Sequence, residues 1–243
     1  MSDIGIIGFG RFGRLAARYL STDFFVAVYS RSDQTEAIIA CGAHPVSLIA
    51  ACKQPILILC MPISAMRAIL DQIAPLLAAG TLVVDVCSVK VYPVQWMREL
   101  LPETVSILAT HPMFGPDSAA TSLKGRKIVL CPERIDSDRY ERIRSWLEKQ
   151  GLVVINATPQ EHDRKIAVSL SLTHFIGRSL SAFGAGELDI DTEGYQRLMH
   201  ILGVVSHDSW QLFEDMHTYN PYAKQKRQAF IDAMAGIHER LGG

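Results

Sequence analysis

Cysteines are few in this chain and show no pairing pattern. Its 243 residues include five, which are odd in number and widely spaced: Cys41, Cys52, Cys60, Cys87 and Cys131. Most of them lie within apolar runs and no Cys-x-x-Cys pair occurs, so the sequence predicts neither a disulfide framework nor a metal site. Free thiols are typical of a reducing compartment, and we therefore expect a cytoplasmic protein.

A strong charge of either sign is also lacking, as are a leader segment and a long hydrophobic run. The formal net charge is -1, which gives no reason to expect nucleic acid or a membrane surface as a partner. No basic stretch followed by a long apolar run opens the chain. No apolar run approaches the roughly 18 residues of a membrane span. With 49% hydrophobic and 20% charged residues, the composition is typical of a soluble globular protein.

Short apolar runs alternate with helical patterns in the first half of the chain. They predict strands at residues 3–8, 24–29, 55–60, 81–86, 105–110, 127–131 and 152–156. Between them we predict helices such as 11–20, 64–78 and 137–149. This alternation is typical of an α/β Rossmann fold with a doubly wound, mostly parallel sheet.

After Thr158-Pro159 only helical spacing continues, as far as Leu241. We therefore predict a dinucleotide-binding Rossmann domain at residues 1–157 and an all-α domain at residues 158–243. The first helix of the second domain, at about 160–184, is apolar and rich in small residues, so we expect it to be buried on most sides. A domain of this length forms only a thin core, which predicts a homodimer through the C-terminal helices.

A glycine-rich turn, Gly8-Phe9-Gly10-Arg11-Phe12-Gly13, joins the first predicted strand to the first predicted helix. Its glycines allow a tight turn, close approach of the backbone to a pyrophosphate and close packing of helix on strand. The phosphates would then lie on the helix N-terminus. The pattern alone is a weak signal, and a turn without a ligand is the alternative. Its strand–turn–helix–strand context favours a nicotinamide dinucleotide site.

The end of the second predicted strand bears on which cofactor is bound. An NAD site usually has an acidic residue there, which binds the ribose hydroxyls. This chain has Tyr29-Ser30-Arg31-Ser32 instead, and a hydroxyl beside a guanidinium suits the 2′-phosphate of NADP. Ser30, Arg31 and Ser32 thus favour NADP. The alternative is that Arg31 is a solvated charge and that Asp33 binds the ribose of NAD.

Two polar segments follow later strands: Asp85-Val86-Cys87-Ser88-Val89-Lys90 and Thr110-His111-Pro112-Met113-Phe114-Gly115-Pro116-Asp117. With the glycine turn, they resemble the prephenate and arogenate dehydrogenases of tyrosine biosynthesis, particularly the arogenate dehydrogenases of plants. Later segments extend the resemblance almost end to end: Glu161-His162-Asp163, Leu172-Thr173-His174-Phe175-Ile176-Gly177-Arg178, Thr192-Glu193-Gly194-Tyr195, Asp208-Ser209-Trp210 and Thr218-Tyr219-Asn220.

The resemblance implies an NADP-dependent oxidative decarboxylation of prephenate, arogenate or both, giving 4-hydroxyphenylpyruvate or tyrosine. It implies that His111 takes the proton of the substrate hydroxyl and that Ser88 orients this histidine or the nicotinamide amide. Cys60-Met61-Pro62-Ile63 resembles the family turn beside the nicotinamide, so Cys60, Met61 and Pro62 join the predicted cofactor site. A histidine with a structural role is the alternative for His111.

The substrate's two carboxylates call for cationic or hydrogen-bonding partners. His174 and Arg178, four residues apart, share one helix face and are predicted to bind them, with an ion pair across a dimer as the alternative. Lys90 either reaches a carboxylate or caps a helix. For His162-Asp163 we favour a structural role. The Thr-Arg pair that binds the ring carboxylate in many bacterial members is absent, so the anchor for that group stays open.

Two other functions remain open at this stage. One is another two-domain NAD(P)-dependent reductase, acting on a β-hydroxy acid or a cyclic imine, because such enzymes also join a Rossmann domain to a helical dimerising domain. The other is a non-catalytic NADP-binding sensor, which leaves His111 and Ser88 without a purpose. The sequence does not decide between prephenate and arogenate.

Overall fold

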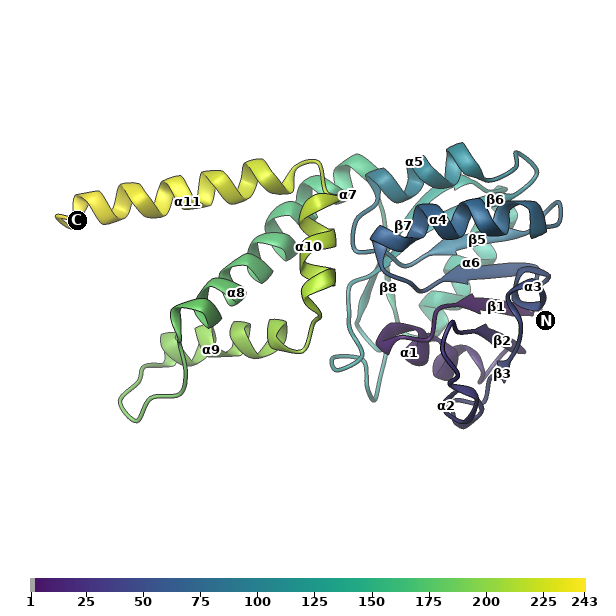
Figure 1. Cartoon of the computed structure of the whole chain (residues 1–243), viewed down its shortest axis with the longest axis horizontal. Coiled ribbons are helices and arrows are strands. Elements are labelled where there is room, and N and C mark those ends of the chain that lie inside the picture. The colour runs from purple at the N-terminus through teal and green to yellow at the C-terminus, as the bar shows by residue number, and fades with distance from the viewer. Residues whose placement is uncertain (1–2) are drawn as a thin grey trace. The chain divides into compact units, whose positions relative to one another are not determined.

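The computed structural model describes residues 3–243 and contains two compact units, Met1–Pro159 and Gln160–Gly243 (Figure 1). The first unit is a Rossmann-type sheet with helices on both faces, and the second is all-helical. The fold class predicted from the hydrophobic pattern is therefore confirmed.

The sheet of the first unit has eight strands in the order β3-β2-β1-β4-β5-β6-β7-β8. The strands are β1 Ile4–Ile7, β2 Val26–Tyr29, β3 His44–Pro45, β4 Ile56–Leu59, β5 Leu82–Asp85, β6 Ser106–Pro112, β7 Lys127–Arg134 and β8 Val153–Asn156. All pairs are parallel except β6 with β7. The seven predicted strands are present, whereas β3, which is only two residues long, was not predicted.

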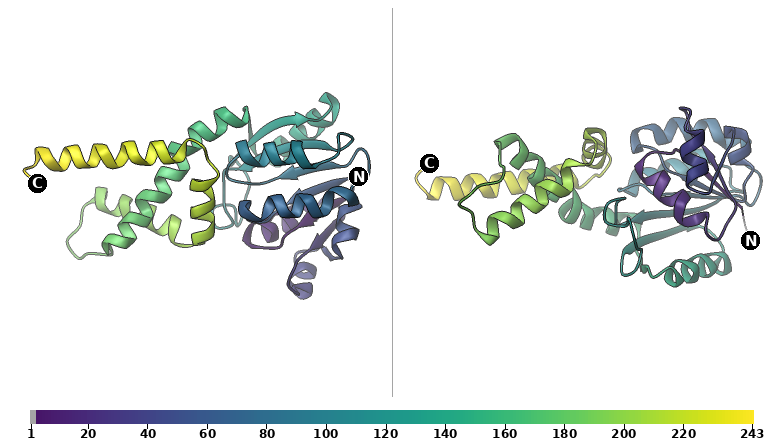
Figure 2. Two further views of the ribbon diagram at one scale, coloured as in Figure 1. Left: turned by 45° about the horizontal axis from the view of Figure 1, so that its top comes forward. Right: turned by 90° about the horizontal axis from the view of Figure 1, so that it is seen from below.

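Helices of the Rossmann unit cover both faces of the sheet (Figures 1 and 2). They are α1 Arg11–Leu20, α2 Thr35–Ala40, α3 Leu48–Cys52, α4 Ile63–Ile73 with the 3-10 turn Ala74–Leu76, α5 Val91–Leu100 and α6 Ser137–Lys149. Helices α1 and α6 lie on the same face, where both line one cavity with the sheet. Helices α4 and α5 lie on the other face (Figure 1). Apolar strands such as β1, which is buried throughout, form the core between these layers.

The register of the central strands brings four loops together. Ile7 of β1 pairs with Leu59 of β4, Leu59 with Asp85 of β5, and Asp85 with Ala109 of β6. Because these strands are parallel, their carboxyl ends meet at one edge of the sheet. The chain order reverses beside β1, and ligands of doubly wound sheets bind at such a point.

The second unit contains α7 Pro159–Ile166, the π-helix Ala167–Leu172, α8 Thr173–Phe183, α9 Glu193–Ser206, α10 Trp210–Thr218 and α11 Ala223–Arg240. Helices α8 and α9 pack closely, as Figure 1 shows. A Cβ at Gly177 would lie 2.5 Å from Cγ2 of Val205, so glycine permits this approach. At Gly184, φ is +84°, a left-handed conformation that ends α8.

The helical stretch Pro159–Phe183 corrects two expectations. It is long and apolar enough, by length and composition alone, to cross a membrane, although no run of that kind was expected. A single stretch of this kind is weak support for a membrane span, because core helices of other proteins share its composition. Only 28% of its most apolar window is buried, so burial on most sides is also wrong for the single chain. The helix thus presents apolar surface that its own unit leaves uncovered.

Candidate active site

The glycine turn after β1 is held in close backbone contact with the loop after β4. Gly8 has φ +99°, and a Cβ there would lie 2.3 Å from the carbonyl oxygen of Cys60. A Cβ at Gly13 would lie 2.2 Å from the carbonyl oxygen of Gly8. A Cβ at Gly10, by contrast, would meet nothing within 4 Å. Packing therefore requires two of the glycines, and the third leaves open space where a pyrophosphate would approach the backbone.

Helix α1 begins directly after this turn. Its N-cap residue, Gly10, supplies no side-chain hydrogen bond, so the first backbone N–H groups remain available to an anion. The Phe9 side chain is buried in the core, which leaves only its backbone to face a cofactor. The ring of Phe12 packs near Phe114, with 6.3 Å between centroids. Of the turn's side chains, Arg11 is the exposed one.

A loop at residues 113–126, between β6 and β7, covers α1. Asp117 forms an ion pair with Arg11 at 2.7 Å. The Arg18 guanidinium donates to the carbonyl oxygen of Ala120 at 2.6 Å, and the Tyr19 hydroxyl donates to that of Ala119 at 2.8 Å. The segment that follows His111 is thus attached along the helix that starts at the cofactor turn.

The predicted 2′-phosphate site lies after β2. Gln34 Nε2 donates to the hydroxyl oxygens of Ser30 and Ser32, at 3.3 Å each, and Gln34 in turn accepts a hydrogen bond from Arg14. Arg31 is exposed, and its guanidinium makes no hydrogen bond or ion pair within residues 3–243. The loop thus holds one guanidinium group and two hydroxyl groups, and Arg14 of α1 is bonded to it through Gln34.

Asp33 is the acidic residue that an NAD site would use. Its carboxylate accepts a hydrogen bond from the backbone N–H of Thr35 at 3.1 Å, at the start of α2. This hydrogen bond lowers the pKa of Asp33. The carboxylate thus has a local structural role, which weakens the alternative in which it binds the ribose of NAD.

The residues after β4 close the other side of the turn. The backbone N–H of Cys60 donates to the carbonyl oxygen of Ile7 at 2.8 Å, and Pro62 precedes α4. Burial raises the pKa of the Cys60 thiol to about 12, with the charge of Asp85 adding to the shift. Cys60 is therefore a protonated, inert side chain at neutral pH. Met61 is half-buried beside it.

The ends of β5 and β6 are joined by a buried ion pair that the sequence did not reveal. Asp85 and Lys90 are both 0% exposed, and the Lys90 ammonium binds the Asp85 carboxylate and the carbonyl oxygen of Thr110. The same carboxylate accepts from the backbone N–H of Cys87 at 2.9 Å. The Thr110 hydroxyl donates to the Asp85 carbonyl oxygen at 2.6 Å.

This network changes the role expected for Lys90. An ammonium that is fully buried and bound to Asp85 is closed to a substrate carboxylate in this structure. Lys90 instead stands at the N-cap of α5 and ties the β5 segment to the β6 segment. It therefore supports the residues beside it in the chain, Ser88 and, through Thr110, His111.

His111 and Ser88 lie directly beside this network. His111 is in β6 and 6% exposed, in register with Val129 of β7. The Ser88 hydroxyl is buried without a hydrogen-bond partner in the described part of the chain. A buried hydroxyl without a partner requires an explanation, and a bound ligand is one that this sheet edge offers. An imidazole and an unsatisfied hydroxyl thus lie on adjoining strand ends, near the glycine turn.

The helical unit holds a second group of buried polar side chains. His174 is buried on α8, with Nε2 3.7 Å from the Asp208 carboxylate, and burial lowers its pKa. Arg178 donates to the carbonyl oxygen of Asp208 and lies over the Trp210 ring, 5.3 Å from its centroid. The predicted pair is therefore brought together on one face of α8.

Three members of this group were missed in the sequence. The Arg227 guanidinium donates to His217 Nδ1 at 2.9 Å. Burial and the Arg227 charge lower the pKa of His217 to about 4, so its ring is neutral. Ser171 lies one helical turn before His174, and that spacing was the only signal in the sequence. Four buried atoms of this group have no partner in the described part of the chain: Ser171 Oγ, His174 Nδ1, Arg178 Nε and His217 Nε2.

His162 and Asp163 form a separate buried pair. Their side chains approach to 2.7 Å, and the Asn220 amide donates to the Asp163 carbonyl oxygen at 2.9 Å. These contacts hold α7 to the segment before α11. Residues 3–243 contain no group of three or more His, Cys, Asp or Glu side chains that could hold a metal ion.

Two family models match the sequence. "Prephenate dehydrogenase, nucleotide-binding domain" matches residues 22–156, and "TYRAAT1-like, C-terminal domain" matches residues 179–243. The chain is similar to arogenate dehydrogenase 2, chloroplastic, of Arabidopsis thaliana, with 32% identity over 253 residues, 99% of this chain and 70% of that protein. Arogenate dehydrogenase 1, chloroplastic, of the same plant is 32% identical over 250 residues, 99% of this chain but only 39% of its own length.

Among solved structures, a similar one is the crystal structure of prephenate dehydrogenase from A. aeolicus in complex with hydroxyphenyl propionate and NAD+. The TM-score is 0.75 at 21% identity, over 100% of this chain and 88% of that one. At this identity the likeness shows the fold.

Proposed function

The chain belongs to the family of prephenate and arogenate dehydrogenases, and from this premise we propose that it oxidises and decarboxylates prephenate, arogenate or both. The observation that carries the proposal is the placement of buried His111 and the unpartnered Ser88 hydroxyl on the ends of two paired strands, at the sheet edge that holds the glycine turn. The resemblance inferred from the sequence is confirmed at the level of the family.

The residues of the sheet edge fit a nicotinamide dinucleotide. The open space at Gly10 and the uncapped start of α1 suit a pyrophosphate, and the Ser88 hydroxyl is free for a polar ligand group. Ser30, Arg31 and Arg14 suit a 2′-phosphate, and we therefore infer NADP in preference to NAD. When bound, the cofactor supplies the hydride acceptor.

The chemistry requires a base near the substrate hydroxyl. As hydride leaves the carbinol carbon, His111 takes the hydroxyl proton, and the carbon becomes a ring carbonyl. The bond to the ring carboxylate then breaks, carbon dioxide leaves, and the electron pair makes the ring aromatic. The resulting phenolate oxygen takes a proton back from His111. The Lys90–Asp85 network holds β6 in place so that His111 stays in reach.

The substrate carboxylates need cationic or hydrogen-bonding partners. Lys90 is not one of them, because its ammonium is buried and paired with Asp85. We assign this role to Arg178 and His174, whose unpartnered Nε and Nδ1 atoms lie on one face of α8. The Arg178 guanidinium stacks on the Trp210 ring and donates to the carbonyl oxygen of Asp208, so its position is fixed before the substrate binds.

We also propose that the chain acts as a cytoplasmic homodimer through the helical unit. Helices α8, α9 and α11 carry exposed apolar side chains, namely Phe183, Leu198, Val204, Ile231, Met234 and Ile237. A second copy would cover such surface. Light-scattering mass of the purified chain tests this assignment, and a monomer at micromolar concentration would contradict it.

The activity is tested by mixing the purified protein with NADP and either prephenate or arogenate, and following the absorbance of the reduced nicotinamide. Turnover with at least one substrate is expected, and the ratio of the two kcat/KM values identifies the preferred one. His111→Asn should lower kcat by about 10²–10⁴-fold while cofactor binding is retained. No turnover with either substrate overturns the proposal, and near-normal activity of His111→Asn removes that residue from its role.

A further inference from the structure

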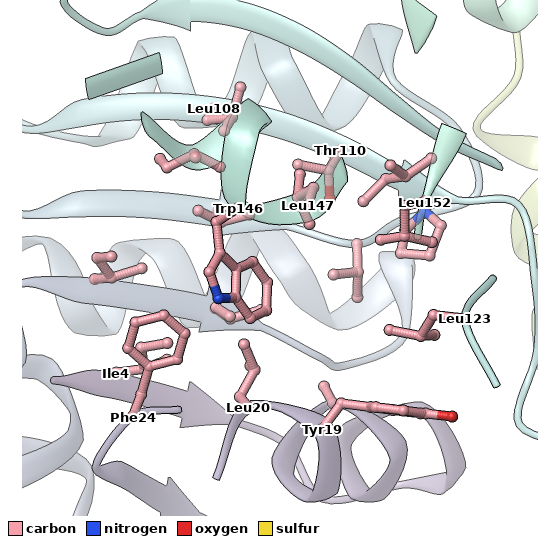
Figure 3. A pocket seen from close by; sticks show the side chains of 18 of the residues that line it. Ile4, Tyr19, Leu20, Phe24, Leu108, Thr110, Leu123, Trp146, Leu147 and Leu152 are labelled. Carbon is pink, nitrogen blue, oxygen red and sulfur yellow. The ribbon is translucent and has the colours of Figure 1, made fainter. Parts of the chain in front are cut away.

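A cavity lies inside the Rossmann unit, between the sheet and helices α1 and α6 (Figure 3). Its volume is about 440 Å³, within the range of small-molecule sites. The floor is formed by side chains of β1, β4, β5 and β6, and the walls by α1, α6 and the 113–126 loop. Neither His111 nor Ser88 lines this space, so the cavity calls for a separate explanation.

The interior of the cavity is apolar and its ends are aromatic. At one end the rings of Phe24 and Trp146 lie 5.2 Å apart (Figure 3). Trp146 Nε1 donates to the Asp23 carboxylate at 3.0 Å. Phe12 and Phe114 line the other end. The hydroxyl group of Tyr19 is already bonded, to a backbone carbonyl oxygen. The space therefore suits an apolar body rather than a polar one.

An empty, sealed apolar void of this volume would cost free energy comparable with the whole stability of a domain. The cavity is not sealed: Tyr19, Trp146 and Leu147 stay half-exposed although the first and third pack against the buried core cluster. Water in contact with so much apolar surface is unfavourable, so an apolar ligand that displaces it is stabilised.

Two arginines of α6 place positive charge at the cavity. Arg139 donates to the carbonyl oxygens of Gly80 and Pro55, at 2.8 and 2.9 Å. Arg142 makes no hydrogen bond or ion pair in the described part of the chain. It also lines a shallow hollow on the outer side of α6, with Asp138 and Glu141 at its rim, so it stands where the cavity meets solvent. Burial, and also the charge of Arg142, lower the pKa of Arg139.

From this arrangement we propose that the cavity binds a small amphipathic carboxylate, with its apolar ring or chain among the aromatic side chains and its carboxylate on Arg142. Thr110 and Pro112, the neighbours of His111 in β6, line the cavity, and so does Phe12 of the cofactor turn. Because neighbouring side chains of a strand point to opposite faces, the occupant contacts the reverse side of the strand that carries His111. The site is thus separate from the sheet edge but adjoins it.

Two fluorescent probes test the proposal without any need for turnover. They are 1-anilinonaphthalene-8-sulfonate, whose sulfonate stands for the carboxylate, and the uncharged N-phenyl-1-naphthylamine, which has the same rings. We expect saturable one-to-one binding of both, with energy transfer from Trp146 that is lost in Trp146→Phe. Excess 4-phenylbutyrate should displace them and saturating NADP should not. Displacement by NADP would assign the probes to the cofactor turn and overturn the proposal.

Variants distinguish the contribution of the Arg142 charge to probe binding from that of the cavity volume. Arg142→Gln should weaken the sulfonate probe about tenfold and leave the uncharged probe unchanged, whereas Arg67→Gln, an exposed arginine of α4, should change neither. Val84→Phe fills the space from β5 and should abolish binding of both probes without lowering the thermal midpoint. Equal affinity of the two probes for the unaltered chain, or full binding to a folded Val84→Phe, contradicts the proposal. If Val84→Phe does not fold, the Arg142 comparison decides alone.

Discussion

The two units of the chain differ in how their buried charged side chains are paired. In the Rossmann unit, Asp85 and Lys90 are fully buried, and each is satisfied by the other, by Thr110 and by the backbone. A buried charge is tolerated only when it is paired in this way. The buried charges at these strand ends are thus paired within the unit itself and hold the strand that carries His111, whereas the nearby Ser88 hydroxyl has no partner within residues 3–243.

In the helical unit, buried polar atoms of α8, its neighbouring π-helix and α10 lack partners within residues 3–243. An unpaired buried polar group costs about 1–3 kcal/mol. Such a group is kept when a ligand or a second subunit completes it. The Asp85–Lys90 pair thus fixes the shape of the strand ends, whereas the Ser88 hydroxyl and the unpartnered atoms of the helical unit are open to a ligand or a second subunit.

The largest expected effect on stability comes from removing one partner of the buried Asp85–Lys90 ion pair. Lys90→Met leaves the Asp85 carboxylate buried without its cation, which should lower the free energy of unfolding by about 3–5 kcal/mol. Urea denaturation at pH 7 measures this loss. The Asp85→Asn/Lys90→Met double variant removes both charges and should recover most of it. A double variant no more stable than Lys90→Met would show that the pair is not what holds the strand ends.

In the helical unit, a substitution at Arg178 should affect substrate binding as well as stability. Arg178→Met should lower the free energy of unfolding by about 2–3 kcal/mol, less than Lys90→Met, because the lost contacts are a backbone hydrogen bond and ring stacking and no buried charge is left unpaired. It should raise KM for the substrate about 10–100-fold through the lost carboxylate contact. Arg197→Met, an exposed arginine of α9, is the matched control and should change neither. A large stability loss with unchanged KM would reverse the comparison.

His217 should make the free energy of unfolding depend on pH. Its pKa falls from 6.5 in the unfolded chain to about 4, so the unfolded state binds the proton first as the pH drops. The free energy of unfolding should therefore decrease between pH 6.5 and pH 4, by about 1–2 kcal/mol for this half-buried ring after allowance for solvent screening. Below pH 4 the dependence on His217 ends. Denaturation at several pH values checks this, and His217→Gln should flatten the slope.

The smallest effect concerns Arg31, which has no partner although it belongs to the Rossmann unit. Arg31→Ala should lower kcat/KM for NADP about fivefold, as expected for one exposed charge contact, and leave kcat/KM for NAD unchanged. Arg67→Ala serves as the control. A preference for NAD in the unaltered chain, unaffected by Arg31→Ala, would show that an unpartnered cation here does not mark a phosphate site.

Local rules explain what was predictable from the sequence. The glycine turn was found because its conformation depends on adjacent residues, and the structure shows why Gly8 and Gly13 tolerate no side chain. Helix α6 was predicted at residues 137–149, its observed bounds, because a regular apolar stripe defines it, and the structure adds an N-cap at Asp136.

Long-range pairing explains what was not predictable. Lys90 was expected either at a substrate carboxylate or at a helix cap, because the sequence does not show that its ammonium also reaches Thr110, twenty residues further on. His217 was missed because its contact with Arg227 depends on how α10 packs on α11. The exposed face of Pro159–Phe183 was also missed, since an apolar sequence indicates burial but not what provides it.

The reversed direction of β7 has a consequence for how this site can change. Because β6 and β7 are antiparallel, the connection between them needs no helix to return across the sheet, and residues 113–126 stay at the edge where β6 ends. They are attached through Arg11, Arg18 and Tyr19 to α1, the helix that begins at the glycine turn. Insertions there would reshape this edge while the order of the strands stays intact. A single reversal in an otherwise parallel sheet thus turns a connector into the most adjustable part of the edge that carries His111.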